Sequence, residues 1–342
     1  MMFRPYRTRF SLGALARRPA LRFNINAVLL VAGLIATWPR PTARAADAPA
    51  SPAAQQPADT LASQPAAEPR VTLLQAGAEP HKLLRLQPKA GAQQTSTMTM
   101  KMTMEMQMGA GDAQPIKMPP MKFVMETTPT SVSPQGDLTY ESVITDATVG
   151  DDPDAMPQVA EAMKDAITSL KTLKVTGRMS TRGINKGVEA KLPEGVSPQS
   201  RQMMEQMKDA FSNTGMALPK EAIGPGAKWE VKQFLKSQGM KLDQTTVYEL
   251  VSVKGDQLTA KSTVTQTAAR QQIANPAMPG MKTDLIKLQS KGTGDLTISL
   301  TQLLPLLATI QMHNETVMGL DINGQQSEMA MKMEMNMRLE TK

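Results

Sequence analysis

The sequence predicts a mainly β (α+β) protein, built as a large curved antiparallel sheet or half-open barrel with two amphipathic helices. Two segments far apart in the chain, 97–108 and 329–340, place methionine or leucine at every second position and mostly polar residues between them. This period-two alternation puts the methionines on one face of a half-buried strand. If the sheet closes on itself, we expect the two methionine strands to become neighbours.

Short alternating runs fill the chain between the two methionine segments. Glycine, asparagine and aspartate separate these runs, and the segment 183–187 (GINKG) predicts a hairpin. Consecutive strands joined by short turns favour antiparallel meanders over βαβ units. The other expected strands are 117–127, 138–148, 173–182, 188–192, 229–237, 241–253, 257–267, 285–289, 294–301 and 309–318.

Two segments have helical spacing instead. Residues 157–170 carry an apolar stripe that includes Val159 and Met163. Residues 197–214 begin with an N-cap serine followed by proline and end just before a glycine, the usual boundaries of a helix. We expect both helices to lay one apolar face against the sheet.

The first 45 residues have the three parts of a secretory signal peptide. Arginines without any acidic residue precede an apolar run over 27–38, and the small residues Ala43 and Ala45 precede Ala46, the expected first residue after cleavage. Twelve apolar residues are fewer than the ~20 that a membrane-spanning helix needs. We therefore expect a secreted or periplasmic protein that does not span a membrane after cleavage.

Composition divides the rest of the chain into two parts. Residues 46–70 are almost wholly alanine, proline, glutamine, serine and aspartate, which predicts a disordered spacer. Residues 71–342 are expected to form a single β-rich domain. The whole chain has 38 Lys+Arg against 31 Asp+Glu, but residues 1–45 hold eight arginines and no acid, so the remainder has 30 against 31. A nearly neutral domain with few aromatic residues is not expected to bind nucleic acid.

The groups that carry most enzyme chemistry are scarce. Cysteine is absent, which excludes disulfides, thiolate metal sites and a cysteine nucleophile. His81 and His313 are the only histidines, and no serine lies in a Gly-x-Ser-x-Gly motif. We therefore expect a non-enzymatic protein with no catalytic residues and no cofactor. A hydrolase that uses a serine with His81 or His313 stays as a third hypothesis.

Methionine is the distinctive residue, with 28 in the chain. These side chains can simply fill a core. Because methionine is flexible and polarizable, a methionine-lined sheet also suits an apolar ligand such as a lipid, or an envelope protein as partner. The alternative is Cu(I) or Ag(I) binding by soft thioethers in Met-x-Met series. The candidate binding residues are Met98, Met100, Met102, Met104, Met106, Met329, Met331, Met333, Met335 and Met337.

Two stretches resemble an uncharacterised family of secreted bacterial β-rich domains. Residues 84–104 (LRLQPKAGAQQTSTMTMKMTM) resemble its opening strand, Pro-Lys-x-Gly turn and Met/Thr-rich second strand. Residues 218–231 resemble its Pro…Gly-x-x-Trp strand start, with Pro219, Gly226 and Trp229 in the matching places. A turn at 292–294 and the methionine-rich last strand also fit. The resemblance covers about 80–342 and implies no established activity or functional residues.

Overall fold

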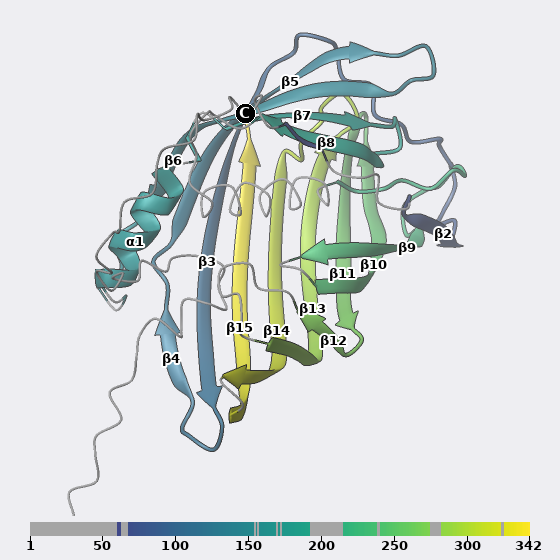
Figure 1. The fold of residues 1–342 in the computed structure, drawn as a ribbon. Helices are drawn as coiled ribbons and strands as arrows, with labels where there is room; N and C mark the ends of the chain where they lie inside the picture. Colours follow the sequence, from purple (N-terminus) through teal and green to yellow (C-terminus); the bar gives the residue numbers. More distant parts are fainter. Residues whose placement is uncertain are drawn as a thin grey trace, which may run out of the picture.

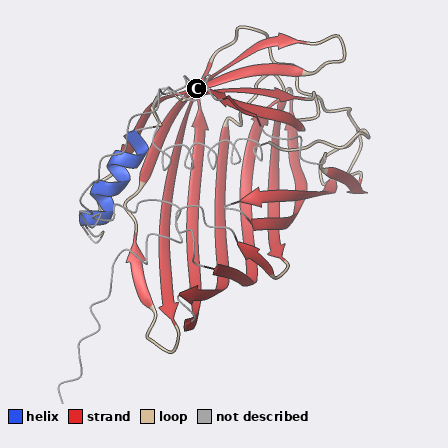
Figure 2. Ribbon diagram, viewed as in Figure 1, coloured by secondary structure: helices blue, strands red, loops and turns tan. Residues whose placement is uncertain are grey.

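The structure is a computed structural model in which strands form one continuous antiparallel sheet (Figures 1 and 2). The expected mainly β fold with a large curved antiparallel sheet is confirmed, and the sheet is not closed into a barrel. The structure describes residues 60–62, 68–153, 155, 157–168, 170–171, 173–191, 215–237, 240–273, 282–322 and 325–342.

The described residues form fifteen strands and one helix. In chain order these are β1 Thr60–Ala62, β2 Arg70–Gln75, β3 Gln94–Met108, β4 Gln114–Lys117, β5 Met121–Val132, β6 Leu138–Val149, α1 Pro157–Thr168, β7 Lys174–Met179, β8 Asn185–Lys191, β9 Lys228–Ser237, β10 Met240–Lys254, β11 Gln257–Ala268, β12 Gln271–Ile273, β13 Lys282–Ser299, β14 Leu307–Ile322 and β15 Gln325–Thr341. No helix in this part of the chain is long and apolar enough to cross a membrane.

The two methionine strands are neighbours at the centre of the sheet. The strand order is β1-β8-β7-β6-β5-β3-β15-β14-β13-β11-β10-β9-β2, with β4 and β12 pairing beside this path on β3 and β13. The expected adjacency of β3 and β15 is therefore correct, but closure into a barrel is not its cause. The last strand instead lies between β14 and the long early strand β3.

Chain connectivity requires the sheet to be strongly curved. β1 and β2 are the two ends of the strand path, yet only eight peptide units separate Ala62 from Arg70. Those residues span at most ~29 Å, whereas thirteen strands laid flat would put the two edges ~58 Å apart. The sheet must therefore bend its edges toward each other, and Figure 1 shows β5, β7, β8 and β9 turned steeply from the long central strands.

Several strand boundaries differ from the expected ones. The strands expected at 285–289 and 294–301 are one continuous strand, β13. The strand expected at 117–127 is split, because Pro119 and Pro120 separate β4 from β5 and proline cannot donate to a ladder. The expected opening strand near Leu84 is also wrong, since residues 76–93 contain no strand and only a single bridge, between Lys82 and Ile223.

The N-terminal and helical predictions fall partly within the described residues. Inside the expected spacer, Thr60–Ala62 pairs with β8, because these three residues contain no proline and offer backbone donors to an open edge. The helix expected at 157–170 is confirmed as α1, and that expected at 197–214 lies outside the described residues. The predicted signal peptide, with Ala43, Ala45 and Ala46, also lies outside them.

One side of the sheet, here called the inner face, carries the core. On this face α1 buries Val159, Met163 and Ile167 in the same cluster as Phe123 and Ile144 of β5 and β6. Farther along the sheet, a second cluster surrounds the fully buried Trp229, which lies just inside β9. Its indole Nε1 donates to the backbone oxygen of Ala217 at 2.8 Å, and its ring stacks on Tyr248.

Candidate ligand-binding face

The register of β3 and β15 opposes methionine to methionine at five successive positions of the inner face. Side chains directly opposite one another in a sheet have Cβ atoms ~4.5–5.5 Å apart, so each pair of thioethers is within reach of its partner. The pairs are Met100–Met337, Met102–Met335, Met104–Met333, Met106–Met331 and Met108–Met329, and Met98 opposes Leu339. The structure thus brings the two sets of candidate residues together on one face.

The methionines of this pair differ in burial. Met104, Met106, Met329 and Met331 are buried and belong to the main core cluster. Seven others are half-buried, and the adjoining residues of β14, Ile310 and Met312, are half-buried too. We define the methionine patch as eight of these nine residues, leaving out Met108 at the far end of β3: Met98, Met100, Met102, Ile310, Met312, Met333, Met335 and Met337. Part of the series therefore fills the core, while the patch keeps accessible thioether surface.

Two glycines of β13 make room beside the patch. A Cβ placed on Gly292 would lie 2.1 Å from the Sδ atom of Met312, so the Met312 side chain lies directly over this glycine. A Cβ on Gly294 would lie 2.7 Å from the Oγ atom of Ser262. The turn expected at 292–294 is therefore wrong, because both glycines lie inside a strand. Their missing side chains leave room for Met312 of β14 and Ser262 of β11.

A row of uncharged polar side chains crosses the inner face next to the patch. The register aligns one residue from each of five neighbouring strands, and the next residue in line is Met333. We call this set the polar row: Gln233, Gln244, Gln266, Ser290 and Asn314. Sequence reasoning missed it, although the signal is visible, because each residue occupies an inward position in a strand whose other inward positions are mostly apolar.

The side chains of the polar row form only some of the hydrogen bonds that they could make. Gln266 Nε2 donates to Gln244 Oε1 at 2.7 Å, and Thr316 Oγ1 donates to Asn314 Oδ1 at 3.1 Å. Ser290 is 2% exposed, and its Oγ atom has no hydrogen-bond partner. Buried hydroxyl groups almost always have a partner; among the described residues, Ser290 Oγ shares this lack of a partner with one other buried hydroxyl, Thr283 Oγ1 of the same strand.

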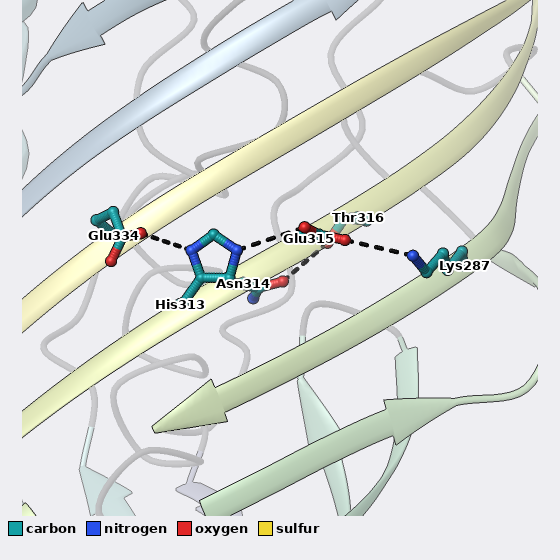
Figure 3. A network of polar contacts seen from close by, with 6 residues as sticks. All are labelled: Lys287, His313, Asn314, Glu315, Thr316 and Glu334. Carbon is teal, nitrogen blue, oxygen red and sulfur yellow. Dashed lines mark hydrogen bonds and ion pairs between the residues drawn. The ribbon is translucent and has the colours of Figure 1, made fainter. Parts of the chain in front are cut away.

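On β3, β13, β14 and β15 the charged residues occupy the positions that face away from the methionines, on the opposite, outer face. His313 of β14 is at the centre of a polar network there (Figure 3). Its Nδ1 atom lies 2.5 Å from Glu334 Oε1, its Nε2 atom lies 3.5 Å from Glu315 Oε1, and Glu315 Oε2 lies 3.3 Å from Lys287 Nζ. The hydrogen bond to Glu334, followed by that to Glu315, raises the pKa of His313 above its ordinary value.

Neither histidine has a serine among the partners that the structure shows. His313 contacts two carboxylates, whereas His81 contacts the Glu79 carboxylate at 3.2 Å and the backbone oxygen of Gly77 at 3.1 Å. The hydrolase hypothesis thus has no serine–histidine pair within the described residues. In the same part of the chain, no three His, Asp or Glu side chains are grouped closely enough to hold a metal ion.

Comparison with known proteins finds similarity to one family over the middle of the chain. Residues 138–302 match the model of a family of unknown function (DUF6263). This match confirms the expected resemblance to an uncharacterised family over β6 to β13. The expected Pro…Gly-x-x-Trp strand start at Pro219, Gly226 and Trp229 lies within these residues and stays a prediction. β3 and β15, with their methionines, lie outside the matched residues. A search of curated protein sequences finds no match.

Similarity to solved structures is slight. The chain aligns with OmpT, an outer membrane protein of Vibrio cholerae, in a form lacking loop L8, at 6% identity and a TM-score of 0.20, covering 73% of this chain and 100% of that one. The in-vitro folded OmpT trimer form aligns at 8% identity and a TM-score of 0.16, covering 73% and 99%. Scores this low do not identify a shared fold.

Proposed function

We propose that this protein is an exported, non-enzymatic envelope or periplasmic domain that binds an apolar ligand, such as a lipid, on the methionine patch. The observation that carries the proposal is the pairing of β3 with β15, which gathers half-buried methionines from two segments far apart in the chain into one surface. Thioether side chains adapt to apolar partners of varied shape. A protein partner with an apolar surface is the other occupant that this chemistry suits.

Native mass spectrometry of the full chain, purified from its own host, tests the proposal. We expect added mass that corresponds to a lipid or to a bound protein. N-terminal sequencing of the same material is expected to begin at Ala46 if residues 1–45 are a cleaved signal.

A matched pair of variants locates the site: Met335→Lys in the patch is expected to abolish binding, whereas Glu334→Lys on the outer face keeps it. Protein that carries no such mass and binds no apolar probe would contradict the proposal.

Cu(I) or Ag(I) binding is a second candidate, favoured by the same register. Opposed pairs such as Met102–Met335 and Met100–Met337 bring thioethers from two strands together, and a soft monovalent ion prefers thioether ligands. Anaerobic titration of Cu(I) against a chelator measures this directly.

Leucine substitutions separate the two candidates. The double variant Met102→Leu/Met335→Leu keeps apolar area and removes two sulfurs, so lipid binding is expected to persist while Cu(I) binding weakens at least tenfold. If the leucine variant competes with the chelator as well as the original protein does, this pair does not bind the metal ion.

A further inference from the structure

We propose that the polar row binds the uncharged, hydrogen-bonding head of an amphiphilic ligand whose hydrocarbon part lies on the methionine patch. The chemical class is that of a monoacylglycerol or a long-chain alcohol. This inference rests on the proposed function, because it takes the patch as the place where hydrocarbon binds. The two features are contiguous, since Ser290 opposes Asn314 and Asn314 opposes Met333.

Ser290 provides the first argument. Its Oγ atom is buried and has no partner, and leaving a buried hydroxyl unpaired costs folding free energy. The residues directly opposite Ser290 on the two flanking strands are Gln266 and Asn314, so its surroundings on this face are polar. A ligand hydroxyl or ester oxygen at this position would supply the missing hydrogen bond.

The neighbouring carboxamides provide both kinds of hydrogen-bonding group. A carboxamide offers two N–H donors and two acceptor positions. Gln266 uses one donor on Gln244, and Asn314 uses its Oδ1 atom to accept from Thr316. The row therefore retains donors beside acceptors, which suits a hydroxyl group, since a hydroxyl donates and accepts at once.

The charge distribution selects an uncharged head over an anionic one. Along β3, β9–β11 and β13–β15, lysine, arginine, aspartate and glutamate occupy the positions that face away from the methionines, as the alternation and register place them. A carboxylate or phosphate bound at the polar row would be desolvated without a cation beside it, which is strongly unfavourable. A neutral head avoids this cost.

Competition binding on the full chain tests the inference. The dye N-phenyl-1-naphthylamine reports hydrocarbon binding, and 1-monooleoylglycerol and oleate are compared as competitors with the same acyl chain. We expect 1-monooleoylglycerol to displace the dye at a concentration at least about tenfold lower than oleate at neutral pH, because only oleate carries a charge.

Two variants connect this preference with the row. Ser290→Ala is expected to weaken 1-monooleoylglycerol binding about three- to tenfold, leave dye binding unchanged and raise the unfolding temperature, because it removes an unpaired hydroxyl. A merely structural serine would lower that temperature. Gln266→Met is likewise expected to reduce the preference for the neutral competitor, whereas the control Gln289→Met, on the outer face of β13, leaves it unchanged.

The outcomes separate the two proposals. Failure of the dye and of both competitors to bind overturns the proposed function, and this inference with it, because the inner face is then filled by the chain's own residues. Dye binding with equal displacement by 1-monooleoylglycerol and oleate, unaltered in Ser290→Ala and Gln266→Met, overturns only the assignment of the polar row.

Discussion

Gly292 and Met312 oppose each other on β13 and β14, and the contact between them limits what can replace the glycine. A Cβ at position 292 would lie 2.1 Å from Met312 Sδ and 2.7 Å from the backbone oxygen of Gln311. Gly292→Ala is therefore expected to lower the free energy of unfolding by about 1–3 kcal/mol, the usual range for overpacking. Urea denaturation measures this change. Thr293→Ala, one residue along on the exposed outer face, is the control and should leave the midpoint nearly unchanged.

His313 permits a second test at the scale of single residues. Hydrogen bonds to Glu334 and then Glu315 raise its pKa, while hydrogen bonds to Lys287 and then His313 lower the pKa of Glu315. We expect NMR titration to give a His313 pKa above the ordinary value, with Glu334→Gln lowering it more than Glu315→Gln. Lys291 opposes His313 and Lys332 opposes Glu315 in the register. Because salt screens these charges, raising the salt concentration should change the difference between the His313 pKa and its ordinary value. A His313 pKa that is unaltered in Glu334→Gln would contradict the network.

The same pKa directions define how this network contributes to stability. A histidine whose pKa is higher in the folded protein stabilises the fold below the pKa of the unfolded chain, and this contribution is lost as pH rises through the folded pKa. A carboxylate whose folded pKa is lowered acts in the opposite sense, losing its contribution as pH falls. The network therefore contributes most to stability at pH values between the lowered pKa of Glu315 and the raised pKa of His313. Because these groups are exposed, the effect is small.

At the scale of elements, α1 stabilises the sheet through one buried stripe. Met163 is 0% exposed and packs in the same core cluster as Ile144 of β6 and Val159 of the helix itself. Met163→Ala is expected to destabilise the protein by about 2–5 kcal/mol, the range for removing a large buried side chain. Calorimetry or urea denaturation measures the loss. Lys164→Ala removes an exposed ion pair with Glu161 and should have little effect. Equal effects of the two substitutions would mean that α1 does not pack as described.

Strand and helix positions were largely predictable because they depend on local patterns. The alternation in 97–108 and 329–340 identified β3 and β15, and the apolar stripe in 157–170 identified α1. Gly292 was misread, because glycine is typical of turns and its role here depends on Met312 of another strand. The polar row was missed for the same reason: Gln266, Ser290 and Asn314 look unrelated until the register aligns them.

For the whole molecule, the pairing of β3 with β15 can be tested directly. The chain contains no cysteine, so an engineered pair has no competitor. Met102→Cys/Met335→Cys places two thiols at directly opposed positions, and oxidation should link them, giving faster migration in non-reducing denaturing electrophoresis. Met102→Cys/Met331→Cys is the control, because Met331 opposes Met106, four residues away. Efficient linkage in the control, or none in the test pair, would mean that the register is different.

The central place of β15 also has a consequence for how the protein is made. A ribosome synthesises β15 after the other strands that the structure describes, yet this strand supplies the sheet's link between β3 and β14. Until it emerges, the nascent chain exposes two long unpaired edges bordered by methionine and isoleucine, and such edges promote aggregation. Pairing over so large a sequence separation is also slow. We therefore expect the growing polypeptide to be held unfolded, or shielded, until β15 is available.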